Sequence, residues 1–216
     1  MQSISRKERE RKAREQYILN AAEKVFNKKS YTDASMEEIA RECDFSRKTL
    51  YQYFKDKESL CYAVITRGLG RLLTYLEMEE KNGSTGFQKL HNLSIGYYKF
   101  YKAYPSTLSL MNHVGSIKLN KENTTASESF VKSTNKIASK IANIIDEGKK
   151  DGSIRTDIDT MKLAVSSEFL ITSFFNMLSI SGKTFMNHFS LDEEAFISFT
   201  LTLLNDAIRK NKSSRS

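Results

Sequence analysis

The sequence predicts an all-α protein. Its 216 residues include one proline and nine glycines, so few positions interrupt a helix. Nearly every segment longer than ten residues repeats apolar residues at the helical period of 3.6, and none shows the convincing alternation of a strand. We expect an N-terminal three-helix domain that contains a helix-turn-helix, followed by a larger helical domain, with about nine helices in the chain.

The composition supports a folded chain without a membrane span. Hydrophobic residues make up 39% of the sequence, which is enough for a core. The sequence has no N-terminal apolar segment of the secretory type and no run of eighteen apolar residues. We therefore expect a cytoplasmic protein. Cys43 and Cys61 lack metal-ligand spacing and are expected to be buried reduced thiols rather than a redox switch.

The net charge of +8 suits a polyanionic partner. Basic residues gather in an N-terminal arm and again around residues 47–57. An arm of this kind commonly contacts phosphates, but its glutamates leave open that it is only a solvated segment. The arm contains Arg6, Lys7, Arg9, Arg11, Lys12 and Arg14, and the second group contains Arg47, Lys48, Lys55 and Lys57.

A broad apolar face predicts the first helix, from about residue 6 to residue 28. Turn-prone residues 28–33 follow it, and Tyr31 offers a large side chain to fill the corner before the next helix. The apolar positions of this face are Ile18, Ala21, Ala22, Val25 and Phe26.

Two short helices with a sharp corner between them are predicted over residues 35–54. Ser35 and Glu38 form an S-x-x-E capping box that begins the first of them. Asp44 and Ser46 supply a turn residue and a second cap, so the next helix follows within about three residues, as in a helix-turn-helix. The apolar positions of the pair are Met36, Ile39, Ala40, Cys43, Leu50 and Phe54.

The second helix of this motif carries side chains that suit nucleic acid. It has no acidic residue, and it offers cationic, amide and hydroxyl donors for phosphates and base edges. Asp56 is the expected cap of a helix from Lys57 to about Met78. The N-terminal amides of that helix together with Lys57 would form a phosphate clamp, the alternative being a generic surface lysine.

In this region the sequence resembles the tetracycline-repressor (TetR) family of bacterial transcription regulators. The resemblance covers roughly residues 12–65 and rests on a dozen or more positions in order and spacing, among them Ile39-Ala40, Phe45-Ser46, Thr49-Leu50-Tyr51, Tyr53-Phe54 and Lys57-Glu58. Cys43-Asp44 stands where an Ala-Gly pair is usual, so Asp44 is expected to adopt a left-handed or otherwise unusual conformation. Arg47-Lys48 stands where a small residue is often found.

The resemblance implies a homodimer whose two recognition helices read a palindromic operator in double-stranded DNA. The residues expected at base edges are Arg47, Lys48, Thr49 and Gln52. Those expected at phosphates are Ser35, Ser46, Tyr51, Tyr53 and Lys57. It also implies three parts: residues 1–57 with the arm and DNA-binding domain, residues 58–210 with an effector-binding and dimerisation domain, and a disordered tail over residues 211–216.

Beyond residue 80 the helical pattern continues. Helices are expected over residues 87–104, in a short segment that contains Met111, and over residues 127–147, 159–181 and 191–210. Loops are expected over residues 81–86, from Gly115 to about Thr125, and over residues 148–157. The effector pocket is assigned to Tyr97, Tyr101, Tyr104, Met111 and Phe174, although an aromatic stripe is more often core. Their character suits a small hydrophobic or aromatic effector.

The last two helices are expected to pair with a second copy of the chain, because they supply more apolar surface than one helical layer needs. The alternative is that they complete the core of the monomer. The residues expected at the dimer interface are Leu163, Leu170, Met177, Phe196, Phe199, Thr200 and Leu203.

The function predicted from these features is that of a homodimeric repressor released from its operator by a small molecule. The alternative is an architectural DNA-binding or protein-interaction module without an effector. No enzyme is expected, because the sequence has no nucleophile elbow, P-loop, zinc motif or paired cysteine motif. No cofactor and no metal ion is expected for the same reason.

Overall fold

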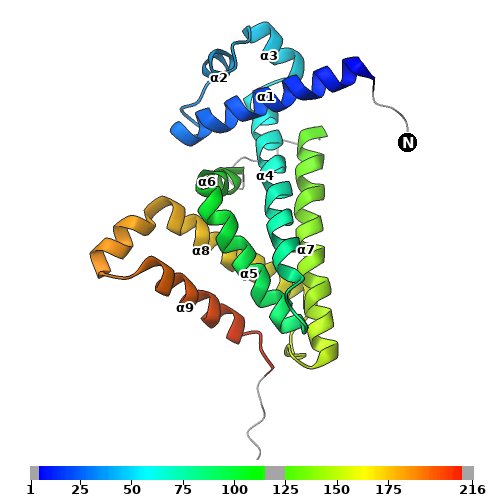
Figure 1. The fold of residues 1–216 in the computed structure, drawn as a ribbon, viewed down its shortest axis with the longest axis vertical. Coiled ribbons are helices and arrows are strands. Elements are labelled where there is room, and N and C mark those ends of the chain that lie inside the picture. The colour runs from blue at the N-terminus through cyan, green and yellow to red at the C-terminus, as the bar shows by residue number, and fades with distance from the viewer. Residues whose placement is uncertain (1–4, 115–124, 211–216) are drawn as a thin grey trace, which may run out of the picture. The chain divides into compact units, whose positions relative to one another are not determined.

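Residues 5–114 and 125–210 are described by the structure, which is a computed structural model of the chain. Most of the expected loop at residues 115–125, and the tail at 211–216, lie outside this range. The described residues form nine helices and no β-strand, which confirms the predicted all-α fold (Figure 1). An isolated β-bridge pairs Ile154 with Arg209. The chain divides into two compact units, Met1–Gly68 with Leu110–Lys132 and Leu69–Ser109 with Ser133–Ser216.

The first unit contains the predicted helix-turn-helix. Each of its helices begins at a capping side chain: the hydroxyl oxygens of Ser5, Ser35 and Ser46 accept hydrogen bonds from the backbone N–H three residues later. The carboxylate of Asp56 accepts one from Ser59 N–H at 2.7 Å. These helices are α1 (Arg6–Lys28), α2 (Met36–Glu42), α3 (Arg47–Tyr53) and α4 (Lys57–Glu80), and all four predicted starts are confirmed.

All four helices contribute to one apolar core in this unit. α2 packs against both α1 and α3, and Leu50 is the buried residue through which α3 joins the core. Burial of such side chains is worth about 1.5–3 kcal/mol each and fixes the orientation of the helices. The side chains with no exposed surface include Ile18, Ala22, Ile39, Leu50, Leu60 and Ile65.

The corner between α2 and α3 is a Schellman motif. Phe45 N–H donates to the carbonyl of Ala40 at 3.0 Å, and Asp44 N–H donates to that of Arg41 at 3.2 Å. This geometry needs a left-handed residue after the helix cap, and Asp44 has a φ of 52°. The expectation for Asp44 is therefore confirmed.

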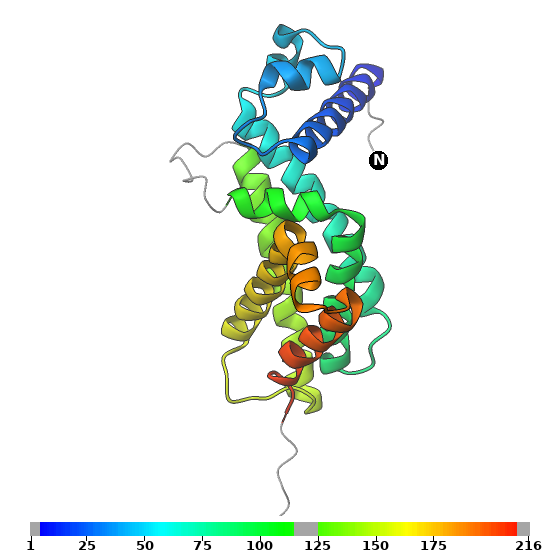
Figure 2. The same ribbon diagram turned by 90° about the vertical axis from the view of Figure 1, so that its left-hand side faces the viewer.

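The second unit is built around α5. This helix packs against α8 and α9, and Figure 2 shows α8 and α9 as neighbours that run in opposite directions. α4, α6 and α7 contribute residues to both units. The remaining helices are α5 (Gly86–Ala103), α6 (Pro105–Val114), α7 (Thr125–Asp151), α8 (Thr160–Phe189) and α9 (Glu193–Asp206).

Three predicted boundaries in this unit are wrong. α7 continues through part of the expected loop and ends at Asp151; the next residue, Gly152, has a φ of +78°. α8 continues past Ser181 to Phe189, because one buried glycine costs a helix only about 1 kcal/mol and its apolar stripe goes on. α9 ends at Asp206, since the backbone of residues 208–210 bonds instead to that of residues 153–155.

α8 is the one helix of the described residues that is long and apolar enough to cross a membrane. Its 30 residues contain an 18-residue window with a mean hydropathy of 1.4. Core helices of soluble proteins meet the same criterion, so this property does not indicate a membrane. α8 nevertheless exposes many apolar side chains, which points to packing against another protein surface.

Candidate functional site

The recognition helix α3 is held by its cap and one buried residue. Ser46 Oγ accepts from Thr49 N–H at 3.0 Å and lies 2.8 Å from Thr49 Oγ1, so both hydroxyl groups are engaged with each other. Leu50 anchors the opposite side in the core. Because the helix has only two turns, these contacts fix which side chains point to solvent.

The exposed face of α3 carries donors without any acid from the helix itself. Arg47, Lys48, Tyr51 and Gln52 are exposed, whereas Thr49 and Tyr53 are half-buried. The Arg47 guanidinium lies 3.8 Å from the carboxylate of Glu37, an exposed pair that is screened by solvent and contributes little. Cations for phosphates and an amide for a base edge therefore occupy one accessible surface.

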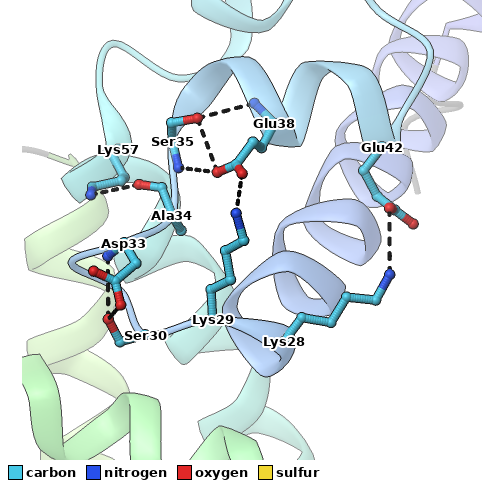
Figure 3. Close-up of polar contacts among 9 residues, drawn as sticks. All are labelled: Lys28, Lys29, Ser30, Asp33, Ala34, Ser35, Glu38, Glu42 and Lys57. Atoms are coloured by element: carbon cyan, nitrogen blue, oxygen red, sulfur yellow. Dashed lines mark hydrogen bonds and ion pairs between the residues drawn. The ribbon is translucent and has the colours of Figure 1, made fainter.

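The start of α2 is held by a complete capping box (Figure 3). Glu38 N–H donates to Ser35 Oγ at 3.2 Å, and Ser35 N–H donates to Glu38 Oε2 at 3.1 Å. The ammonium group of Lys29 also bonds to Glu38. Hydrogen bonds from Lys29 and Ser35 lower the pKa of Glu38. Ser35 lies exposed at this helix start, with its hydroxyl already engaged by Glu38.

Lys57 has a role that the sequence does not reveal. Its ammonium group donates to the carbonyl oxygens of Tyr31 at 2.8 Å and Thr32 at 3.2 Å. It also donates to the carbonyl oxygen of Ala34 at 2.8 Å, the bond drawn in Figure 3. It also lies 4.5 Å from the centre of the Tyr31 ring. Burial and nearby negative charges raise the pKa of that tyrosine to about 12. The three carbonyls use all three N–H donors of Lys57, so a phosphate contact would need one of these bonds to open.

Arg67 is a second partly buried cation that the residue pattern does not predict. Its guanidinium donates to the side-chain oxygen of Asn20 at 2.7 Å, to the carbonyl of Leu19 at 3.0 Å and to the carboxylate of Glu23. It therefore fastens α4 to α1 within the first unit. Nothing in the residue pattern singles it out, because the two segments are more than forty residues apart.

The five residues expected at the effector pocket do not gather at one cavity. Tyr97 lines a small cavity in the second unit, whereas Phe174 lines a different one between α8 and α9. The ring of Tyr101 stacks on that of Phe175, with 5.2 Å between the ring centres, and the ring of Tyr104 packs edge-on against that of Tyr75. Met111 belongs to the first unit. Their assignment as one ligand wall stays a prediction.

The cavity beside Tyr97 is enclosed by α5, α7, α8 and α9. Its volume is about 40 Å³, close to that of one water molecule. The lining is apolar apart from a few polar side chains, and it contains one acid and no Lys, Arg or His. The lining residues are Leu90, Leu93, Ser94, Tyr97, Ile141, Ser167, Glu168, Leu170, Ile171, Leu204, Asn205 and Ile208.

Glu168 and Tyr97 are the titratable groups of this cavity. Burial raises the pKa of Glu168 from 4.5 to about 7, with no opposing contribution from a cation. The hydroxyl of Tyr97 is buried without a hydrogen-bond partner in the described structure, and burial, with Glu168 nearby, raises its pKa well above 10. A buried unpaired polar group is costly, so this pair is unusual for a purely structural core.

α8 and α9 also carry many exposed apolar side chains, one of which, Leu170, lines the cavity as well. Leu170, Met177, Phe199 and Leu203, all expected at a dimer interface, are exposed by 50–67%. Phe196 and Thr200 are half-buried, and Leu163 is buried in the monomer. Further exposed apolar residues, on α8 and on the loop that follows it, are Met161, Val165, Phe169, Ile180, Phe185, Phe189 and Leu191.

Comparison with known sequences relates the first unit to regulators. Residues 18–64 match the family described as bacterial regulatory proteins, tetR family. An HTH-type transcriptional regulator of Staphylococcus aureus (strain USA300) is 31% identical over 108 residues. That match covers 50% of this chain and 58% of the relative, so the chain spans little more than half the relative's length.

Comparison with solved structures extends the likeness in fold to most of the chain. A bacterial regulatory protein in the tetR family from Rhodococcus RHA1 has a TM-score of 0.69 at 20% identity, covering 92% of this chain and 98% of that one. FadR from Bacillus subtilis, solved in complex with stearoyl-CoA, has a TM-score of 0.68 at 20% identity, covering 89% and 98%. At these identities the similarity is one of fold.

Proposed function

Because this chain belongs to the tetR family of bacterial regulatory proteins, we propose that it is a cytoplasmic homodimeric repressor that a small molecule releases from a palindromic operator. The observation that carries the proposal is the exposed, acid-free face of α3 on a rigidly capped helix-turn-helix. A face of this kind suits the major groove, where cations and amides distinguish base pairs.

We assign the exposed residues of α3 to two kinds of DNA contact. Arg47 and Lys48 suit guanine, and Gln52 suits adenine, with each good pair worth about 1–3 kcal/mol of discrimination. Thr49 is a weaker candidate, since its hydroxyl is engaged with Ser46. The residues proposed at phosphates are Ser35, Ser46, Tyr51, Tyr53 and Lys57.

The apolar surface of α8 and α9 supports the proposed dimer. Single exposed apolar residues are normal, but a contiguous set on two neighbouring helices is typical of a surface that another chain covers. A palindromic operator needs two-fold symmetry, so a second copy of the chain is the proposed occupant. Two helices from each copy would form a four-helix interface.

The effector half of the proposal requires two conformations of the protein. An effector that prefers the form unable to bind DNA, by a coupling free energy of roughly 1–3 kcal/mol, would weaken operator binding about 5- to 150-fold. α4 has residues in both units and is therefore the proposed connection. The ligand-bound FadR structure supports ligand binding by this fold, although the small cavity here also suits an architectural module without an effector.

Selection of bound duplexes from a random DNA pool tests this function. The proposal predicts that the selected duplexes contain an inverted repeat whose half-sites lie about one helical turn apart. It also predicts that light scattering gives the mass of a dimer at micromolar protein concentration. A non-repeated preferred sequence together with a monomeric mass would contradict the proposal. A dimer on a palindrome that no compound releases would favour the architectural alternative.

A further inference from the structure

Three features of the second unit remain unexplained by DNA binding. They are the partly buried Glu168 carboxyl group, the unpartnered Tyr97 hydroxyl, and the cavity that both line. Tyr97 has only 1% of its surface exposed, so solvent does not satisfy the hydroxyl group. A core built only for stability would place apolar side chains at such positions, because a buried polar group without a hydrogen-bond partner destabilises the fold.

We propose that this cavity is the effector head-group site and that it binds the amino group of an apolar amine, with Glu168 as the counter-ion and Tyr97 as a second acceptor. The inference rests on the proposed ligand-responsive function and names the chemical class of its ligand. It narrows the expectation of a small hydrophobic or aromatic effector to an apolar molecule with an amino group, because the lining contains an acid.

The chemistry of the lining selects this class. Glu168 has no cation beside it among the lining residues, so the charge that would complement it must come from a ligand. A carboxylate or phosphate would instead meet a like charge with no Lys, Arg or His to pair with it. An N–H group can donate to the carboxylate and to the phenolic oxygen at once, and charge-assisted bonds of this type are the strong ones.

The apolar lining residues fit the remainder of such a molecule. Leu90, Leu93 and Ile141 line the cavity together with the polar pair. Leu170 also lines it and is half exposed in the monomer, so it marks the mouth there. The volume of about 40 Å³ admits an amino group but not a whole effector. The alkyl part must therefore pass the mouth or displace lining side chains, which is the kind of rearrangement that an effector needs to shift a conformational equilibrium.

Isothermal titration calorimetry of the full chain at pH 7 tests the proposal with three probes of equal length: hexylamine, 1-hexanol and hexanoate. Hexylamine should bind, 1-hexanol should bind more weakly, and hexanoate should give no heat of binding. Glu168→Gln should weaken hexylamine binding about tenfold or more without weakening 1-hexanol binding. Tyr97→Phe should weaken hexylamine binding by a smaller factor, and the exposed control Glu194→Gln should leave it unchanged.

Any of three results overturns the inference. The first is equal binding of all three probes, and the second is equal hexylamine affinity in the wild type and Glu168→Gln. The third is no heat from hexylamine at millimolar concentration, which would mean that the cavity holds only water. Operator binding by the same preparation separates the two proposals. If DNA binds and hexylamine does not, the inference alone fails, whereas Glu168-dependent amine binding without DNA binding would contradict the repressor function.

Discussion

The ammonium group of Lys57 donates a 2.8 Å hydrogen bond to the carbonyl oxygen of Ala34, the residue directly before the α2 cap. The first residue of α4 thereby holds the loop that positions the helix-turn-helix. Because the loop carbonyls have no helical partner, loss of this lysine would leave part-buried acceptors unsatisfied. Lys57 is thus a structural residue of the DNA-binding domain, whether or not it also meets a phosphate.

Replacing Lys57 with Ala is expected to lower the free energy of unfolding by about 1–3 kcal/mol, because charged hydrogen bonds to part-buried carbonyls are lost. Urea denaturation measures this change. The exposed Lys81→Ala is the matched control and should change stability by less than about 0.5 kcal/mol. Equal stability of the two variants would contradict the structural role of Lys57.

The same variant tests the phosphate contact. Affinity for DNA falls as the salt concentration rises, and the slope of log affinity against log salt reflects the number of phosphates neutralised. Removal of a lysine that neutralises one phosphate reduces the magnitude of this slope by about one. We expect Lys57→Ala to weaken binding to all sequences and to flatten the salt dependence by that amount. Weaker binding with an unchanged slope would show that Lys57 acts only through the loop.

Asp44 provides a test of the α2–α3 corner. Its φ of 52° is a conformation that glycine adopts freely and β-branched residues avoid. Asp44→Gly should therefore keep the free energy of unfolding within about 1 kcal/mol of the wild type, whereas Asp44→Val should lower it by about 1–2 kcal/mol. Chemical denaturation of the three proteins checks the order, and an equally stable valine variant would refute it.

The first unit was predicted closely because its signals are local. Each signal lies within about four residues of chain. The pair Ser35 and Glu38 begins α2, Asp44 makes the turn after it, and Asp56 caps the start of α4. The arm helix and the α2–α3 corner follow from the same short-range rules. The fold of the candidate DNA-binding surface was therefore accessible from sequence.

The second unit was predicted less well because its features depend on contacts distant in sequence. α7 continues through Gly148, whose neighbour in space is Gly86: a Cβ added at Gly86 would lie 2.1 Å from the backbone nitrogen of Gly148. The cavity at Tyr97 and Glu168 likewise requires four helices to meet. The helical period of the sequence shows which face of each helix is apolar, but it does not show which helices pack against each other. The contact between the two glycines and the position of the cavity could therefore not be predicted from the sequence.

The dimer proposal predicts the effect of a charge on α9. Leu203 is 60% exposed in the monomer, so Leu203→Glu should leave the fold intact while placing an unpaired charge in the interface. We expect the dimer dissociation constant to rise by at least about tenfold. Met78 is also 60% exposed but lies on α4, so Met78→Glu is the matched control and should remain dimeric in sedimentation experiments.

The partly buried Glu168 predicts a pH dependence of stability. Because burial raises the pKa of Glu168 from 4.5 to about 7, the folded protein holds this proton more tightly than the unfolded chain does. Its contribution to the free energy of unfolding therefore falls as pH rises from about 4.5 to 7, by up to about 3 kcal/mol, and stays low above that range. Tyr97, the other titratable lining group, stays neutral throughout because its pKa lies well above 10.

Glu168→Gln should remove that fall, so its stability should exceed the wild type's at pH 8 but not at pH 4. Urea denaturation at both pH values measures the difference, with Glu194→Gln as an exposed control that should follow the wild type. An identical pH dependence in the wild type and Glu168→Gln would mean that this carboxyl titrates normally.

The central claim, that the exposed face of α3 reads DNA sequence, is tested most directly by Gln52→Ala. Fluorescence anisotropy would compare the wild type and the variant on the selected operator and on duplexes substituted at one base pair of each half-site. We predict that the variant loses about 1–3 kcal/mol of discrimination at a single position of the half-site and keeps it elsewhere. The same loss of affinity on every duplex, with all preferences retained, would contradict the claim.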